Sequence, residues 1–473
     1  MQSLLTSFPQ LIFFLPDILT GASLISLIVF RSFFKEKRSD VIFPKLAFIL
    51  STICLIATLP CSLLAQKFDT GFFVYSSNLS YMKNILLAVF TFGLSILSYA
   101  KKYKTANGSF FVTIFGFINS AMLCLSASNF LALLLGLELY TFSLIFILFL
   151  DKKDTESRKF IIKFLFLSSI MTAVFLFGCS LLYSQFGSLS FSKFDLTKDF
   201  LSTLGAILIL CSILFKLGGV PFHFWLLEIY EKFSIFVVLL LDAVWKFFMF
   251  FIFIRVFHIP IFGETSQYRL ILSISGIVSM IFGAVAPIFQ KNIARFIATA
   301  SIGHLGFLMT VFAVTDKAQT IASMMSYLAY YSLSSVCFFS AIILAKKYKS
   351  IRNFSDISGI SNEFPYVGFL ILLSMFSMIG VPPFGSFFAK FDILKSLIQS
   401  KNYTSFSFSI LHSLVSVFYV AKWSKILFES ERLRSISIKI SNFIPRVEIA
   451  VLLFSVFAYD CIKTIFLKII NGL

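Results

Sequence analysis

The segment LFKLGGVPFHFW, residues 214–225, places a lysine in one of the most apolar parts of the chain and follows it with two glycines and a proline. A charge at mid-membrane costs about 2.5–3.5 kcal/mol on insertion scales. Proline removes a helix hydrogen bond and clashes with the preceding turn. Such breaks are tolerated at membrane depth only inside protein or along a wet cavity. The segment therefore indicates either an ordinary proline kink or part of a transport pathway.

The composition of the whole chain is that of an integral membrane protein. Of its 473 residues, 58% are hydrophobic and 13% are charged, and the mean hydropathy is +0.94, whereas a soluble domain has roughly 25% charged residues. The net charge of +18 lies in short loops between apolar spans, so it reflects topology better than a nucleic-acid surface. The seven cysteines lie in apolar stretches without a CxxC pair, so we expect no disulfide framework, metal site or Fe–S cluster.

Apolar segments of the length that crosses a bilayer, about 20 residues, recur along the chain. We predict about fourteen, near residues 9–30, 43–65, 82–100, 109–127, 129–150, 160–184, 202–227, 233–257, 268–288, 294–314, 321–345, 365–398, 403–428 and 447–468. Every second loop is rich in Lys and Arg, and the positive-inside rule places those loops in the cytoplasm. The sequence therefore predicts an all-α polytopic membrane protein with both termini on the outer, periplasmic side.

An internal repeat emerges when GGVPFHFW (218–225) is compared with IGVPPFGSFF (379–388). Each reads Gly-Val-Pro and then Phe inside a long apolar span, the seventh and the twelfth. Five spans separate the two, and an odd number reverses polarity, so spans 4–8 and 9–13 form two predicted inverted repeats, each with one broken helix. Matched broken spans point to a transport pathway. The predicted segments are 1–108 (three N-terminal helices), 109–258 and 259–430 (the repeats) and 431–473 (a C-terminal loop and helix).

Seven ionisable residues are predicted inside apolar spans: Glu138, Lys216, Asp242, Lys246, His304, Lys390 and His412. Asp242 and Lys246 are four residues apart on one helix and can form a local ion pair, and snorkelling is an alternative for any single lysine. Lys216 has no acidic residue within a turn, so its counter-ion must come from another helix, and Glu138 is the natural candidate. Burial favours the neutral form of a lysine and a nearby carboxylate favours the charged form, so this pair can load or release a proton.

The two histidines follow the predicted repeat. His304 falls in span 10, the counterpart of the span that holds Glu138, and His412 falls in span 13, the counterpart of the span that holds Lys246. Each is either on a proton path or a hydrogen-bonded structural residue. The charged positions would form a row across the middle of the membrane from Glu138 to Lys390.

Four segments carry a family resemblance: LLLGLELYTFSLI, FKLGGVPFHFWLLEIY, NIARFIATASIGHLGFL and LSMFSMIGVPPFGSFFAKFDIL. From about span 4 to span 13 the chain resembles the antiporter-like, proton-pumping subunits of respiratory complex I and of multisubunit cation/proton antiporters. The resemblance implies that Glu138 and Lys216 are the coupled pair, Lys246 the relay and Lys390 the distal lysine. His304, His412 and Asp242 are further candidates for the proton path, on their positions in this sequence and not on the resemblance.

The chain departs from the family pattern at two places. It reads EIYEKFSIFVV where the family has a Pro-rich linker, and Asp242 and Trp245 stand where the family has small uncharged residues before the relay lysine. The extra carboxylate is expected to hold Lys246 protonated and so to alter the order of proton transfer, while the family resemblance is unaffected.

The resemblance implies a proton-translocating membrane subunit of NADH:quinone oxidoreductase with no redox chemistry of its own. The alternatives are a subunit of a multisubunit Na⁺/H⁺ antiporter and a membrane scaffold that has lost pumping, although the intact set of buried charges argues against the scaffold. No GxGxxG follows a strand and no Cys cluster is present, so we expect no cofactor in this chain. The implied setting is a hetero-oligomer in the cell inner membrane, with antiporter-like and small membrane subunits and the lipid bilayer as partners, and no nucleic acid.

Overall fold

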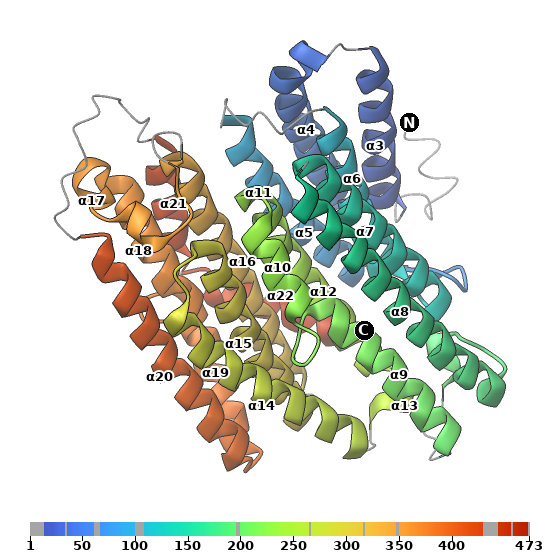
Figure 1. Ribbon diagram of the computed structural model, residues 1–473. Helices are drawn as coiled ribbons and strands as arrows, with labels where there is room; N and C mark the ends of the chain where they lie inside the picture. The colour runs from blue at the N-terminus through green and yellow to red at the C-terminus, as the bar shows by residue number, and fades with distance from the viewer. Residues whose placement is uncertain are drawn as a thin grey trace. The chain divides into compact units, whose positions relative to one another are not determined.

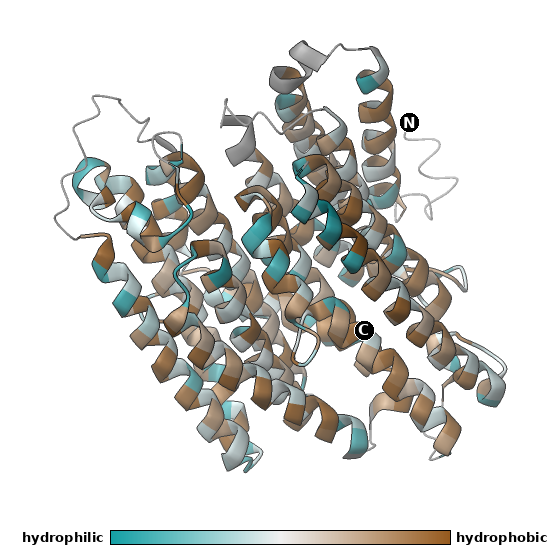
Figure 2. Cartoon of the chain, in the orientation of Figure 1, coloured by the Kyte–Doolittle hydropathy of each residue, from teal (hydrophilic) through white to brown (hydrophobic). Residues whose placement is uncertain are grey.

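The computed structural model describes residues 14–33, 36–60, 67–99, 108–152, 154–194, 199–263, 266–315, 317–346, 350–428, 443–455 and 457–471. These residues are almost entirely helical (Figure 1), and apolar residues cover most of the length of the helices (Figure 2). The chain divides into two compact units: unit 1 comprises Met1–Leu217, Phe248–Thr265 and Gly472–Leu473, and unit 2 comprises Gly218–Phe247 and Ser266–Asn471.

Unit 1 contains the N-terminal helices and a short hairpin. Its elements are α3 (Leu15–Phe33), α4 (Glu36–Thr58), β1 (Lys67–Asp69), β2 (Val74–Ser76), α5 (Ser77–Tyr99), α6 (Gly108–Ser126), α7 (Phe130–Asp151), α8 (Thr155–Phe186), η2 (Phe191–Lys193), α9 (Phe200–Leu217), most of α12 (Lys246–Phe257) and α13 (Pro260–Gly263). The two strands pair antiparallel. Side chains define where the long helices begin. Asn129 caps α7, and Asp154 caps α8 by accepting from the Ser157 N–H, which holds the pKa of the exposed Asp154 carboxyl below its ordinary value.

Unit 2 contains the remaining helices. They are α10 (Phe224–Lys232), α11 (Ile235–Leu239), η3 (Leu240–Trp245), the first two residues of α12, α14 (Ser266–Phe289), α15 (Ile293–Val314), α16 (Ala318–Ala345), η4 (Phe354–Ile357), α17 (Ile360–Glu363), α18 (Pro365–Ile379), α19 (Gly385–Gln399), α20 (Tyr403–Ile426), α21 (Phe443–Phe454) and α22 (Tyr459–Asn471). The apolar window of α15 is 94% buried, whereas that of α20 is 33% buried. A helix that is apolar on all sides belongs in a protein interior, so α15 is central in this unit and α20 exposes an apolar face for lipid.

Among the described helices, ten are long and apolar enough to cross a membrane: Leu15–Ser32, Gly108–Ser126, Phe130–Asp151, Thr155–Phe186, Phe200–Leu217, Ile235–Phe257, Gln267–Phe289, Ile293–Val314, Ala318–Ala345 and Tyr403–Ile426. The chain is therefore a multi-pass membrane protein. The four further predicted spans correspond to α4, to α5, to the α18 and α19 pair, and to the α21 and α22 pair. The predicted count of fourteen, the inverted repeats and the four segment boundaries stay predictions.

Both Gly-Val-Pro segments interrupt a helix, as the sequence predicts. Helix α9 ends at Leu217, and Gly218 has φ +76°. Helix α18 ends at Ile379, and Gly380 has φ +79°. Left-handed backbone of this kind is where glycine ends a helix at no steric cost. The next helices start only at Phe224 and Gly385, so the predicted span 202–227 stops directly after Lys216 and resumes as α10.

Candidate functional site

Lys216 of unit 1 lies at the end of α9 among oxygen atoms from two other helices. Its Nζ is 3.5 Å from Oε1 of Glu138 on α7, and it donates to Oγ1 of Thr141 at 2.5 Å and Oγ of Ser168 at 3.4 Å. Thr172 donates to the same Glu138 oxygen at 2.6 Å. The Lys216 side chain is 7% exposed and that of Glu138 is 26% exposed. The counter-ion predicted from the sequence is thus the carboxylate that Lys216 faces.

Close packing of α8 on α9 brings the α8 hydroxyls to this pair. A Cβ added to Gly178 would lie 2.6 Å from the carbonyl oxygen of Gly205, so only glycine permits this approach. Two turns nearer the pair, the Ser212 hydroxyl donates to the Met171 carbonyl at 2.9 Å and fixes the two helices in register. Ser168 and Thr172 flank Met171, and their hydroxyls consequently reach Lys216 and Glu138.

Asp242 of unit 2 is the centre of a second buried cluster. Its Oδ1 accepts from Lys246 at 2.5 Å and from Tyr230 at 2.9 Å, and its Oδ2 accepts from Tyr331 at 3.1 Å and from Ser335 at 2.6 Å. Asp242 is 0% exposed and Lys246 is 4% exposed. The Asp242 carboxylate thus accepts four hydrogen bonds, one from Lys246 and three from hydroxyl groups on α10 and α16. These hydroxyls hold the carboxylate in place beside Lys246.

Lys246 has further partners beside Asp242. Its Nζ donates to the hydroxyls of Tyr230 and Ser301, and it lies 5.0 Å from the centre of the Tyr230 ring. Asp242 belongs to η3, a π-helical turn that directly precedes Lys246. Single π-helical turns inside α-helices occur frequently at functional sites, so the irregular backbone and the buried pair coincide.

His304 and His412 form a third polar group in unit 2. Their ring centres are 5.2 Å apart at an interplanar angle of 86°. Nδ1 of His304 is 2.9 Å from the Tyr327 hydroxyl, and the His304 ring lies 5.5 Å from the ring of Tyr331, which also bonds Asp242. Both ring nitrogens of His412 are buried and make no hydrogen bond to the described part of the chain. The histidines therefore adjoin the Asp242 cluster through Tyr331.

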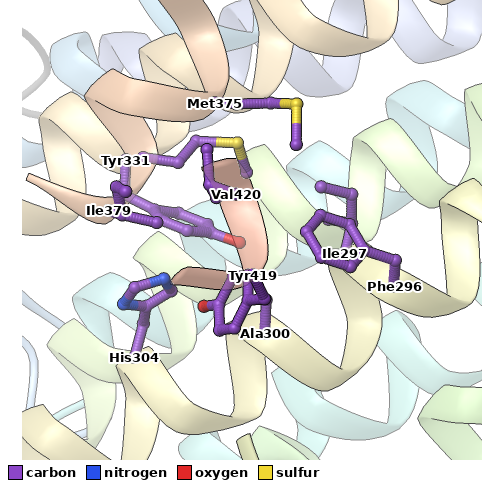
Figure 3. A pocket seen from close by; sticks show the side chains of 10 residues that line it. Phe296, Ile297, Ala300, His304, Tyr331, Met375, Ile379, Tyr419 and Val420 are labelled. Carbon is purple, nitrogen blue, oxygen red and sulfur yellow. The ribbon is translucent and has the colours of Figure 1, made fainter. Parts of the chain in front are cut away.

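A small, partly open pocket lies beside His304. Its lining, shown in Figure 3, consists of Phe296, Ile297, Ala300, His304, Tyr331, Met375, Met378, Ile379, Tyr419 and Val420. The Tyr419 hydroxyl is buried and makes no hydrogen bond within the described ranges. The lining thus contains three polar side chains, His304, Tyr331 and Tyr419, in an apolar shell, and His412 lies next to His304.

Lys390 on α19 is 4% exposed and donates to the backbone carbonyl of Ile379, at the end of α18, at 3.1 Å. Its Nζ lies 5.7 Å from the centre of the Phe307 ring. No carboxylate of the described residues lies within 4 Å of it, in contrast to Lys216 and Lys246. The Ile379 carbonyl can accept this hydrogen bond because α18 ends at that residue, at the second helix break. Lys390 therefore lies at the break, as expected from its position in the sequence.

The structure brings the seven predicted residues into three groups, Glu138 with Lys216, Asp242 with Lys246, and His304 with His412, while Lys390 stands on the α18–α19 break. Lys216 belongs to unit 1 and Lys246 to unit 2, so the predicted row that joins them stays a prediction. Sequence reasoning missed the hydroxyl partners, namely Thr141, Ser168, Thr172, Tyr230, Ser301, Tyr331 and Ser335. The position of Thr141, three residues after Glu138, is the one signal that could have revealed a partner, because both share a helix face.

The chemistry available to these groups is proton exchange. Lysine, carboxylate, imidazole and hydroxyl groups alternate as donors and acceptors in sites that exclude most water. Within the described ranges, no three His, Cys, Asp or Glu side chains gather as metal ligands. Charged groups placed inside a membrane mark ion pathways and proton relays in general.

Residues 127–416 match the family model described as NADH:quinone oxidoreductase/Mrp antiporter, TM. A relative from Pelagibacter ubique, named NADH-quinone oxidoreductase subunit N, is 31% identical over 421 residues, covering 88% of this chain and 89% of that protein. A chain of respiratory complex I from Thermus thermophilus superposes with a TM-score of 0.75 at 20% identity, covering 97% of this chain and 98% of that one. A chain of the Mrp complex from Dietzia sp. superposes with a TM-score of 0.85 at 13% identity, covering 98% and 97%.

Proposed function

Since the chain belongs to the NADH:quinone oxidoreductase/Mrp antiporter transmembrane family, we propose that it is subunit N of an NADH-quinone oxidoreductase and moves protons across the membrane. The name of the similar Pelagibacter ubique protein supports this identification, because that protein matches over nearly its whole length. The observation that carries the proposal is the pair formed by the buried Lys216 and the partly buried Glu138, 3.5 Å apart, directly before a helix break.

The proposed mechanism uses the pair as a switch. The Glu138 carboxylate stabilises the charged form of Lys216, whose own burial favours the neutral form. A change in the distance between the two groups therefore loads or releases the Lys216 proton. Thr141 and Ser168 hold the amine in both states, because a hydroxyl can accept from an ammonium and donate to an amine.

Unit 2 supplies the proposed later steps. Lys246 acts as the relay, restrained by Asp242, and Lys390 acts as the distal lysine. His304, His412 and the hydroxyls of Tyr327 and Tyr331 provide groups that can pass a proton. The Asp242 carboxylate is paired with Lys246 and accepts hydrogen bonds from three hydroxyls. Its proposed role is therefore to stabilise the charged form of Lys246, and not to carry the proton itself.

We propose further that the chain has no redox role and binds no cofactor, because its own groups support proton exchange alone. NADH oxidation and quinone reduction then belong to other subunits, with antiporter-like and small membrane subunits as neighbours. The proposed location is the cell inner membrane with both termini on the periplasmic side. A Na⁺/H⁺ antiporter subunit is the alternative, and the likeness to the Mrp chain, at 13% identity, speaks for the shared fold alone.

Purification in mild detergent separates the two functions. We expect the chain to co-purify with hydrophilic flavin and Fe–S subunits and with NADH:quinone activity that acidifies the outside of cells. Co-purification with a small set of membrane subunits only, without NADH-dependent activity, would instead identify an antiporter.

A further inference from the structure

Glu448 on α21 is a buried carboxylate that none of the three groups above uses. It is 2% exposed. Its Oε2 accepts a hydrogen bond from the Ser340 hydroxyl of α16 at 2.5 Å. Its Oε1 is also buried and accepts no hydrogen bond within the described part of the chain. Helix α21 packs against α16 and α18, so the side chain is enclosed between three helices.

Glu448 lacks a counter-ion among the described residues, since no basic nitrogen there lies within 4 Å of it. Arg446, two residues earlier, is exposed and donates to the Tyr366 hydroxyl at 2.9 Å. Tyr366 is the one ionisable residue of α18.

The ionisable residues of α16 offer Glu448 no positive charge. Cys337 lies one turn before Ser340 on this helix. The three tyrosine hydroxyls are bonded elsewhere, that of Tyr327 to His304, that of Tyr330 to the Ser455 carbonyl and that of Tyr331 to Asp242.

An ionised carboxylate in this place would be costly. An isolated charge transferred into a low-dielectric interior loses far more solvation than one hydroxyl donor returns, and such a group takes up a proton instead. The neutral acid fits the observed contacts: Oε2 is then the carbonyl oxygen that accepts from Ser340, and Oε1 carries the proton.

The depth of Glu448 places it near one surface of the membrane. It is the sixth residue of α21, and Ser340 lies five residues before the end of α16 at Ala345. At about 1.5 Å per residue, both lie about 8 Å inside the helix ends. The adjoining loops, which contain Lys346 and Arg434, are on the predicted cytoplasmic side.

We propose that Glu448 is a further proton-binding site, which takes a proton from the cytoplasmic water and holds it as a neutral carboxylic acid. The balance is simple: the carboxylate and one proton give the acid, release reverses this, and Ser340 keeps its bond to Oε2 in both forms. No electron moves. The direction of uptake rests on the proposed function, whereas the protonated state rests on the contacts of Glu448 alone.

Infrared spectra of the purified, assembled complex near neutral pH test the protonated state. The probes are the native complex, Glu448→Gln, Ser340→Ala and a matched control, Glu156→Gln, which makes the same change at an exposed carboxylate paired with Lys159. We expect Glu448→Gln to remove a carbonyl band of a protonated carboxylic acid that shifts in D₂O. Ser340→Ala should shift this band, and Glu156→Gln should leave it unchanged. An unchanged band in Glu448→Gln would overturn the proposal.

The uptake role is tested by the proton-to-electron ratio of the same variants in proteoliposomes. We expect Glu448→Gln to lower the ratio and Glu156→Gln to retain it. Loss of the band with an unchanged ratio would overturn the uptake role. If instead Lys216→Ala pumped like the native complex, the proposed function would fail while the infrared result on Glu448 still stood.

Discussion

At the scale of single residues, the environment of Lys216 indicates that its proton must be removable. Two hydroxyls and one carboxylate hold a side chain that is almost fully buried. Arginine is charged at all relevant pH values, whereas lysine loses its proton readily on burial. A side chain that only anchored α9 could be lysine or arginine, whereas a side chain that binds and releases a proton must be lysine.

Lys216→Ala should therefore abolish or greatly reduce proton pumping and coupled NADH:quinone turnover while the complex still assembles. Lys216→Arg should fail as well, because its charge cannot be released. The measurement is NADH-driven proton uptake by inverted membrane vesicles, with assembly checked on native gels. Lys159→Ala, at an exposed lysine of α8, is the matched control and should pump normally. Normal pumping by an assembled Lys216→Ala complex would exclude Lys216 from the path.

Glu138→Gln should uncouple the pair and shift the pH profile of activity. An opposite charge within about 4–6 Å shifts a titration by roughly 1–3 pH units, and the two groups are 3.5 Å apart. Without the carboxylate, the charged form of Lys216 is less stable and is lost at lower pH. Activity should consequently fall at a lower pH than in the native protein as the pH rises. Glutamine keeps the shape, so assembly should survive, and Glu138→Asp should recover part of the activity.

The contrary result for Glu138→Gln is equally clear. Normal pumping with an unshifted pH profile would make Glu138 a structural carboxylate that Thr172 holds in the bundle.

Asp242 and Lys246 form a buried ion pair. The effects of substituting them on the stability of the protein should therefore not be additive. Removing one partner of such a pair costs about 3–5 kcal/mol, because the other charge is left buried and unpaired. Asp242→Asn should therefore lower the thermal stability of the purified complex, and the addition of Lys246→Met should recover much of the loss. A double variant as unstable as the sum of the two single variants would show that the pair does not interact.

At the scale of elements, the sequence predicted the positions of the two helix breaks and of most helices. Glycine and proline mark the breaks at Gly218 and Gly380 because each has a strong local effect on backbone geometry. The division between α21, which ends at Phe454, and α22, which begins at Tyr459, was not predicted, because the sequence between these two residues contains neither glycine nor proline.

The charged residues of the candidate site could be predicted from the sequence, and the hydroxyl groups that bond them could not. Glu138 and Lys216 stand out because charges are rare in apolar spans. Serine and threonine are common in membrane helices, where they bond their own backbone, as Thr172 bonds the Ser168 carbonyl at 3.0 Å. Glu448 was missed because it is the second residue of the predicted span 447–468, where a charge is expected at the interface.

The contact between α8 and α9 should be sensitive to one methyl group. Gly178→Ala would place a Cβ 2.6 Å from a backbone oxygen of α9, which cannot move aside as a side chain can. Overpacking of this kind costs about 1–3 kcal/mol, and it should also displace Ser168 and Thr172 from Lys216 and lower pumping. Gly21→Ala on α3 is the control, because no atom lies within 4 Å of its added Cβ. Thermal inactivation of the two variants tests this, and equal stability would contradict it.

At the scale of the whole molecule, the charge of the loops sets the orientation in the membrane. Lys152 lies just before α8 and Arg158 lies in its first turn, whereas the segment between α8 and α9, GSLSFSKFDLTKD (187–199), contains two lysines and two aspartates and has no net charge. The positive-inside rule therefore predicts that α8 starts in the cytoplasm. Helix α8 has 32 residues and is about 48 Å long at 1.5 Å per residue, which exceeds a hydrocarbon core of about 30 Å, so both of its ends reach water.

Single cysteines on either side of α8 test this orientation, in a background where the exposed Cys461 is replaced by serine. A membrane-impermeant maleimide added to cells with a permeabilised outer envelope should label Ser192→Cys, whereas Glu156→Cys should react only in inverted vesicles. Both positions are exposed and both lie in unit 1, so access differs only by the side of the membrane. The reverse labelling would invert the whole topology, because the loop charges alternate along the entire chain. It would then place Glu448 and the adjoining ends of α16 and α21 on the periplasmic side, where a proton is released and not taken up.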